Sequence, residues 1–228
     1  MKFNINNVVD TNNADVQVIQ EFFSKFFESF AEETVKFHDH WGMLPFTHSE
    51  KQVNSVVVPA MHKITNNVWL EQPFKVANEQ RFLDIATVHG NNIYLIELKH
   101  SWNSKNENIA KNTDGEWETA IDQIADLKRN TVKQFVNHKD FNIFRIALMV
   151  MPTYLTNDLN HGILEQSSQQ YAENIYNKYQ EYRSEKYRAN YVSTWKVEDY
   201  ESYAHEYDGG KQIFPFISFV ARIEKIFD

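Results

Sequence analysis

Three charged residues lie in two neighbouring segments that otherwise have the composition of strands. Asp84 lies in the first segment, and Glu97 and Lys99 lie two residues apart in the second. Because side chains alternate between the two faces of a strand, Glu97 and Lys99 are expected on one face. A two-residue turn at residues 90–91 would pair position 89 with 92 and place Asp84 directly opposite Glu97.

Two carboxylates facing each other across a sheet destabilise it unless a cation lies between them. Mg²⁺ ordinarily takes one or two carboxylates and completes its shell with water and phosphate oxygens, so Asp84 and Glu97 are candidate ligands for Mg²⁺ or Mn²⁺. The chain has no cysteine, which excludes a thiolate metal site. The alternative is a solvent-facing hairpin with a cross-strand salt bridge, but Ile93 and Leu95 on the same face argue against full exposure.

The elements that would position these residues follow from hydrophobic periodicity and turn residues. Apolar residues at helical spacing predict helices at residues 14–36, 49–64 with Ser49 as N-cap, 116–137 and 159–188. Short alternating or wholly apolar runs predict strands at 68–76, 81–89, 92–102, 141–151 and 191–197, with Pro152 ending the fourth. The type of the apolar segment 213–227 is left open. This order predicts an α/β fold with a mixed central sheet flanked by helices.

Asp84 on the second strand, the triplet Glu97-Leu98-Lys99 on the third, and the order of elements from about residue 50 to 151 resemble the PD-(D/E)XK nuclease superfamily. That family shares a helix, a three-strand meander, a helix and a further strand. Leu83 stands where the family name has proline, a variable position. The resemblance implies a single restriction-endonuclease-like domain, with a helical extension at 1–48, a catalytic core at 49–151 and a long helix and strand added at 152–228.

The activity that this resemblance implies is Mg²⁺-dependent hydrolysis of phosphodiester bonds, with double-stranded DNA as the expected substrate and endonuclease action. Asp84 and Glu97 would bind the metal, which lowers the pKa of a bound water. Lys99 would orient the hydroxide and stabilise negative charge in the transition state. Gln123 stands on the following helix where many members have a glutamine, although the tyrosine that some subfamilies place four residues later is Leu127 here.

Many members also carry a glutamate on the first core helix that helps to hold the metal. Glu50, near the start of the second predicted helix, matches that position, and Glu71 on the first strand of the meander competes for the role. A plain alternative for Glu50 is a favourable charge at a helix N-terminus.

Residues expected to contact nucleic acid lie in two places. His100 and Trp102 follow Lys99 directly, with aromatic packing as the alternative. The predicted helix at 159–188 alternates tyrosines with basic residues that could bind phosphates, namely Lys178, Arg183, Lys186 and Arg188. The alternative there is a solvated helix whose tyrosines pack inward, since glutamates dilute its positive charge. A loop cluster of His38, Asp39, His40 and His48 lacks helix-based ligand spacing, and no zinc site is expected.

Composition bounds the class of protein. The chain has 228 residues with 42% hydrophobic and 24% charged residues, as in ordinary globular domains. The net charge of −8 argues against a non-specific nucleic-acid coat protein, so any DNA would need a local basic groove. No basic leader or apolar run of about 18 to 20 residues is found, which predicts a cytoplasmic protein with no membrane contact.

Two rival hypotheses remain beside the nuclease. One is a non-catalytic member of the same fold that binds nucleic acid or protein. The other is an unrelated α/β protein in which the hairpin charges are structural. Since cleavage of a duplex needs two cuts, a homodimer is the expected assembly of a nuclease with one site per chain.

Overall fold

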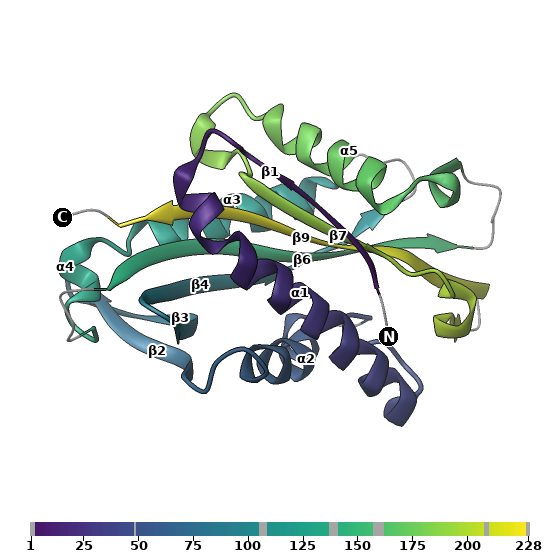
Figure 1. Cartoon of the computed structure of the whole chain (residues 1–228), viewed down its shortest axis with the longest axis horizontal. Helices are drawn as coiled ribbons and strands as arrows, with labels where there is room; N and C mark the ends of the chain where they lie inside the picture. Colours follow the sequence, from purple (N-terminus) through teal and green to yellow (C-terminus); the bar gives the residue numbers. More distant parts are fainter. Residues whose placement is uncertain are drawn as a thin grey trace.

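A mixed β-sheet of nine strands forms the centre of the computed structural model, which describes residues 3–47, 49–104, 109–136, 141–156, 162–207 and 210–226 (Figure 1). The strand order is β1-β7-β9-β6-β4-β3-β2, while β5 pairs with β6 and β8 pairs with β9. The strands are β1 Asn4–Val9, β2 Val68–Val76, β3 Glu79–His89, β4 Asn92–His100, β5 Asn103–Ser104, β6 Asn142–Thr156, β7 Tyr191–Lys196, β8 His205–Tyr207 and β9 Gly210–Lys225. The protein is therefore α/β with a mixed open sheet, as expected.

Helices cover both faces of the sheet and divide the core into two layers. On one face, α1 (Ala14–Trp41) and α2 (Glu50–His62) pack on the side chains of β4 that include Tyr94, Ile96 and Leu98. On the other face, α3 (Lys111–Ala125) and α5 (Ser168–Gln180) pack on the alternate residues Ile93 and Leu95. The short helix α4 (Arg129–Val132) and three single-turn 3₁₀ segments at Gly162–Glu165, Glu185–Tyr187 and Tyr200–Tyr203 complete the helical content of the described residues.

The expected meander is confirmed, because β2, β3 and β4 pair antiparallel in sequence order. β4 then pairs in parallel with β6, and α3 supplies the crossover that parallel strands require. The phenylalanine stripe of α1 is buried, as its 3.6-residue period predicts, and the Asn13 side chain accepts the backbone N–H groups of Asp15 and Val16 to cap the helix.

Two expected helices are wrong in extent. The helix predicted at 116–137 is split: α3 begins at Lys111 and ends at Ala125, and Lys128 is extended before α4. The chain turns there so that Leu127 and Val132 can both enter the core. The helix predicted at 159–188 begins with a capping box at Ser167 and ends at Gln180, while residues 157–161 lie outside the described residues.

Three further differences come from pairing between distant segments. Pro152 lies inside β6 and does not end it. On the side of β6 that pairs in parallel, β4 ends at His100 and β5 begins only at Asn103, so no strand there needs the N–H that Pro152 lacks. The strand predicted at 92–102 therefore ends two residues early. The apolar segment whose type was left open, 213–227, supplies residues 213–225 of β9. The first strand, β1, was not predicted.

The described helices include none that is long and apolar enough to cross a membrane. The predicted histidine loop at residues 38–48 is partly helical, because α1 continues to Trp41. His38 packs edge-on against Tyr203 and His40 contacts the Lys36 carbonyl, whereas His48 lies outside the described residues.

Candidate active site

The β3–β4 hairpin has the register that the sequence predicts. Gly90, with a φ of 58°, occupies the two-residue turn in the left-handed conformation that glycine adopts without strain. Pairing runs from His89 opposite Asn92 to Ile85 opposite Ile96. Asp84 is one residue beyond the last pair, so β3 leaves β4 at the position where the two carboxylates face each other.

Three charged side chains meet at this point. Asp84 Oδ2 accepts the backbone N–H of Leu98 at 2.7 Å, and Lys99 Nζ lies 2.9 Å from Glu97 Oε1. The Glu97 and Lys99 side chains are 5% and 12% exposed, so this is no solvent-facing salt bridge. The structure thus brings Asp84, Glu97 and Lys99 together near the carboxyl end of β4.

Burial perturbs the titration of both carboxyl groups. Burial and the neighbouring Asp84 charge together raise the pKa of Glu97 to about 7, against the opposing effect of Lys99. Burial also raises the pKa of Asp84, against the Leu98 N–H and the Lys99 charge. Both shifts favour the protonated forms, because the two carboxyl groups lie side by side in a site where charges are poorly solvated. The pair therefore holds a proton more tightly than isolated carboxyl groups do.

Lys99 remains charged in this environment. Burial alone would lower its pKa, but Glu97, Glu50 and Asp84 surround the ammonium and raise the pKa above its ordinary value. A fixed cation therefore lies beside the carboxylate pair, in a site where water screens charges poorly.

Glu50 belongs to the same cluster. It is the first residue of α2, and it lies close enough to Lys99, Asp84 and the backbone of His100 for them to shift its pKa. Burial raises the pKa of Glu50; Lys99 lowers it, and the charges of Asp84 and Glu116 raise it. Glu116 on α3 was not predicted, although its position at the start of the helix that follows Glu97-Leu98-Lys99 could have suggested it.

The side chain of Glu71, the competing candidate, is not part of the cluster. It is exposed on β2, and the described residues include no hydrogen bond or ion pair of its side chain with the cluster. The structure therefore places Glu50, and not the Glu71 carboxylate, beside Asp84 and Glu97.

The carboxylates of the cluster are the oxygen ligands that a divalent cation could use. Within the described ranges, no group of three or more histidine, cysteine, aspartate or glutamate side chains could hold a metal ion by itself. The half-buried Asp84 and the buried Glu97 nevertheless supply two adjacent carboxylates, the number that Mg²⁺ takes when water and phosphate oxygens complete its shell. A cation between them would relieve the repulsion by which the Asp84 charge raises the pKa of Glu97. The residues present therefore fit Mg²⁺ or Mn²⁺ bound together with substrate.

Gln123 is separate from this cluster. It lies in the last turns of α3, where Arg145 binds the carbonyls of Ile124 and Ala125, whereas the first turns of α3 contact Ser101 and Trp102 through Thr113. Its Oε1 atom is buried without a hydrogen-bond partner among the described residues. No described contact joins Gln123 to the charged groups.

His100 and Trp102 are half-buried and pack against each other. Burial lowers the pKa of His100 to about 4, although the backbone of Phe46 opposes the shift, so the imidazole is neutral at physiological pH. The His100 ring lies 4.9 Å from the Trp102 ring, edge to face, and Trp102 also contacts Tyr154. Aromatic packing, the alternative left open above, describes both residues.

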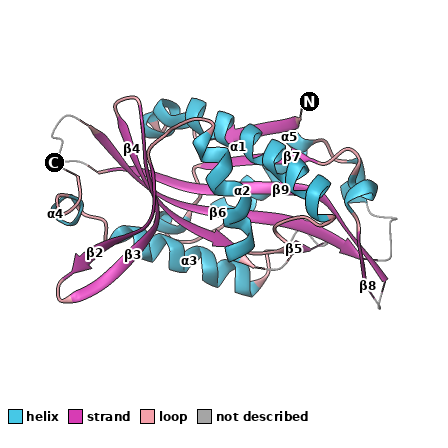
Figure 2. Ribbon diagram, turned by 90° about the horizontal axis from the view of Figure 1, so that it is seen from below, coloured by secondary structure: helices cyan, strands magenta, loops and turns pink. Residues whose placement is uncertain are grey.

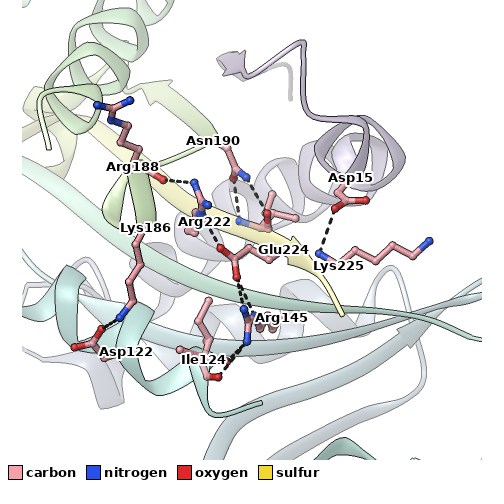
Figure 3. A network of polar contacts seen from close by, with 12 residues as sticks. Asp15, Asp122, Ile124, Arg145, Lys186, Arg188, Asn190, Arg222, Glu224 and Lys225 are labelled. Carbon is pink, nitrogen blue, oxygen red and sulfur yellow. Dashed lines mark hydrogen bonds and ion pairs between the residues drawn. The ribbon is translucent and has the colours of Figure 1, made fainter. Parts of the chain in front are cut away.

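The basic residues at 178–188 lie in and after α5 and are largely paired with acidic neighbours. Lys186 contacts Asp122 on α3 (Figure 3). Arg188 binds the Tyr182 carbonyl. Lys178 Nζ lies 3.3 Å from Glu181 Oε1, and the Arg183 side chain is exposed. Buried tyrosines of α5, among them Tyr171 and Tyr179, face the core. The ion pairs neutralise much of the positive charge on which phosphate binding here would depend.

Comparison of the chain with protein-family models, curated proteins and solved structures returned no match. Two carboxyl groups with raised pKa values, a third carboxyl group and a charged lysine lie near one another where β3 separates from β4.

Proposed function

We propose that this protein is a metal-dependent nuclease of the PD-(D/E)XK type that hydrolyses phosphodiester bonds, with DNA as the substrate. The observation that carries the proposal is the contact of Lys99 with the buried Glu97 carboxylate beside Asp84, whose charge raises the pKa of Glu97. Charged groups are costly to bury, and evolution retains them mainly where they bind or react.

Each residue has a role that follows from its chemistry. Asp84 and Glu97 would hold Mg²⁺, with Glu50 adding negative charge from α2. When bound, the metal lowers the pKa of a coordinated water and offsets charge on the phosphate. The Leu98 N–H fixes the Asp84 carboxylate, and Glu97 orients the Lys99 ammonium. Lys99 would donate hydrogen bonds to the attacking oxygen or to the negative charge of the transition state.

The test is hydrolysis of a labelled DNA duplex and of single-stranded DNA, with Mg²⁺, Mn²⁺ or EDTA. Wild type should cleave only with metal. Lys99→Ala should lose about two to three orders of magnitude in rate, as removal of one group aimed at developing charge typically does. Lys25→Ala is the matched control, because Lys25 is exposed on α1 and pairs with Glu21 one helical turn away. This variant should cleave DNA like wild type.

Three outcomes separate the hypotheses. Loss in Lys99→Ala with normal cleavage by Lys25→Ala supports the nuclease. DNA binding without metal-dependent cleavage in wild type would instead support a non-catalytic binding protein of this fold. Equal cleavage by wild type and Lys99→Ala would place the activity in another site or in a contaminant.

A homodimer is part of the proposal for duplex cleavage, because one chain provides one carboxylate pair. Sedimentation at tens of micromolar should show a dimer, and duplex breaks should form without accumulation of nicked strands. Monomers that only nick would show that the two strands are cut independently.

A further inference from the structure

The β2–β3 hairpin changes direction at one rung, and that rung contains Asp84. β2 pairs with β3 through Leu70 opposite Ile85 and through Gln72 opposite Leu83. This register places Glu71 opposite Asp84, yet these two residues form no pair in the ladder. Glu71 has a φ of 51°, a left-handed conformation that non-glycine residues adopt at a cost.

Both strands change faces at this rung. Residues two apart in a regular strand share a face, but Ile85 packs in the layer of α1 and α2 while Leu83 packs in the layer of α3 and α5. Phe74, beyond Glu71 on β2, also joins the second layer. In Figure 2 the β2–β3 hairpin turns away from the direction of β6 and β9. A left-handed residue in an edge strand bends the strand in this way, as in a β-bulge.

The turn of the hairpin determines where the Asp84 carboxylate lies. Pairing of β3 with β4 ends at Ile85, so the Leu98 N–H lies beyond the last β3–β4 pair. Asp84 Oδ2 accepts this N–H at 2.7 Å. The side chain of Asp84 thus fills the opening between the two strands, and the same contact holds it beside Glu97.

We propose that Glu71 is a positioning residue whose left-handed backbone, and not its carboxylate, holds Asp84 in the cluster. Its side chain is exposed, and among the described residues it has no hydrogen bond or ion pair with the charged groups. The proposal rests on the proposed function only where it predicts metal affinity. The placement of Asp84 against Leu98 is independent of catalysis.

Substitutions at this position separate backbone from charge. Glu71→Gln removes the charge with a similar backbone preference, Glu71→Gly favours positive φ, and Glu71→Val disfavours it because valine is β-branched. Lys75→Val is the matched control, an exposed residue of the same strand with ordinary backbone geometry. Two quantities are measured: exchange of the Leu98 amide by NMR in EDTA, and Mn²⁺ affinity by calorimetry.

Glu71→Gln and Lys75→Val should match wild type in both measurements, and Glu71→Gly should exchange the Leu98 amide no faster than wild type, because glycine does not pay the left-handed cost that glutamate pays. Glu71→Val should exchange the Leu98 amide faster and bind Mn²⁺ more weakly than wild type, because β-branching adds to that cost, and it should differ from Glu71→Gly by about tenfold or more. If Glu71→Val does not fold, Glu71→Ala compared with Glu71→Gly carries the same test, with exchange about tenfold faster expected in the alanine variant.

Equal Leu98 exchange in Glu71→Val and Glu71→Gly, or in Glu71→Ala and Glu71→Gly where alanine replaces valine, overturns the proposal. An equal loss of Mn²⁺ affinity in Glu71→Gln also overturns it, because the carboxylate would then be the active group. If wild type binds no Mn²⁺ but Leu98 exchange follows the expected order, the positioning role of Glu71 stands and the metal-dependent function fails.

Discussion

Glu97 should make the metal-free protein less stable as the pH rises. Its pKa is about 7 in the folded protein and 4.5 in the unfolded chain, so the folded state binds a proton more tightly. Such a group favours folding most at low pH, and this contribution is lost as pH rises from about 4.5 to about 7. The difference in pKa corresponds to about 3 kcal/mol of the free energy of unfolding, which is present at low pH and lost above pH 7.

The perturbation is Glu97→Gln, which keeps the shape of the side chain and removes the titration. Urea unfolding in EDTA at about pH 5 and about pH 8 gives the free energy of unfolding of both proteins. Relative to wild type, the variant should gain about 2 to 3 kcal/mol between these two pH values. Loss of the Lys99 contact lowers the stability of the variant at both pH values and leaves this difference in place.

Glu224→Gln provides a control of opposite sign. Burial raises the pKa of Glu224, but Arg145 and Arg222 outweigh burial and hold the pKa below its ordinary value. Figure 3 shows this carboxylate between the two guanidinium groups. Its stabilisation is present above the unfolded pKa and is lost at lower pH, so Glu224→Gln should cost more at pH 8 than near pH 4. A pH-independent difference between Glu97→Gln and wild type would refute the reasoning about the carboxylate pair.

Three further predictions concern single side chains. Asp84→Asn should melt at the same or a higher temperature than wild type in EDTA. It should also lose the stabilisation by Mn²⁺, which in wild type adds about 2.7 kcal/mol to the free energy of unfolding at a hundredfold excess over Kd. Asn190→Ala should lower the free energy of unfolding by about 3 kcal/mol in urea titrations, because the buried amide bonds both the N–H and the carbonyl of Ile223 (Figure 3). Lys186→Ala should leave DNA affinity in gel-shift assays unchanged, since Lys186 is paired with Asp122; a clear loss of affinity would restore the predicted phosphate contact.

Local pattern was sufficient to predict the hairpin that carries the candidate site. Alternation of side chains and a two-residue turn depend on neighbours in the chain, so the sequence predicts that Glu97 and Lys99 share a face with Ile93 and Leu95. The structure has this arrangement. The meander and the stripe of α1 follow from the same short-range periodicity.

Long-range pairing decided what periodicity left open. β9 is a strand because β6 and β7 flank it, and Pro152 is tolerated because its neighbouring strand is interrupted. Similarly, Lys186 is paired with Asp122, which is 64 residues away in the chain, and this contact removes a charge that the sequence presents as free for phosphate.

The sequence by itself determined which chemical groups are available: two carboxylates and a lysine on adjacent strands, with no thiol. Only the tertiary structure decided which other groups join them. Glu50 enters through the start of α2, and the turn of the hairpin at Glu71 brings Asp84 to the Leu98 N–H. The physical reason is desolvation, because the pKa of Glu97 and the charge of Lys99 depend on residues packed around them from separate elements.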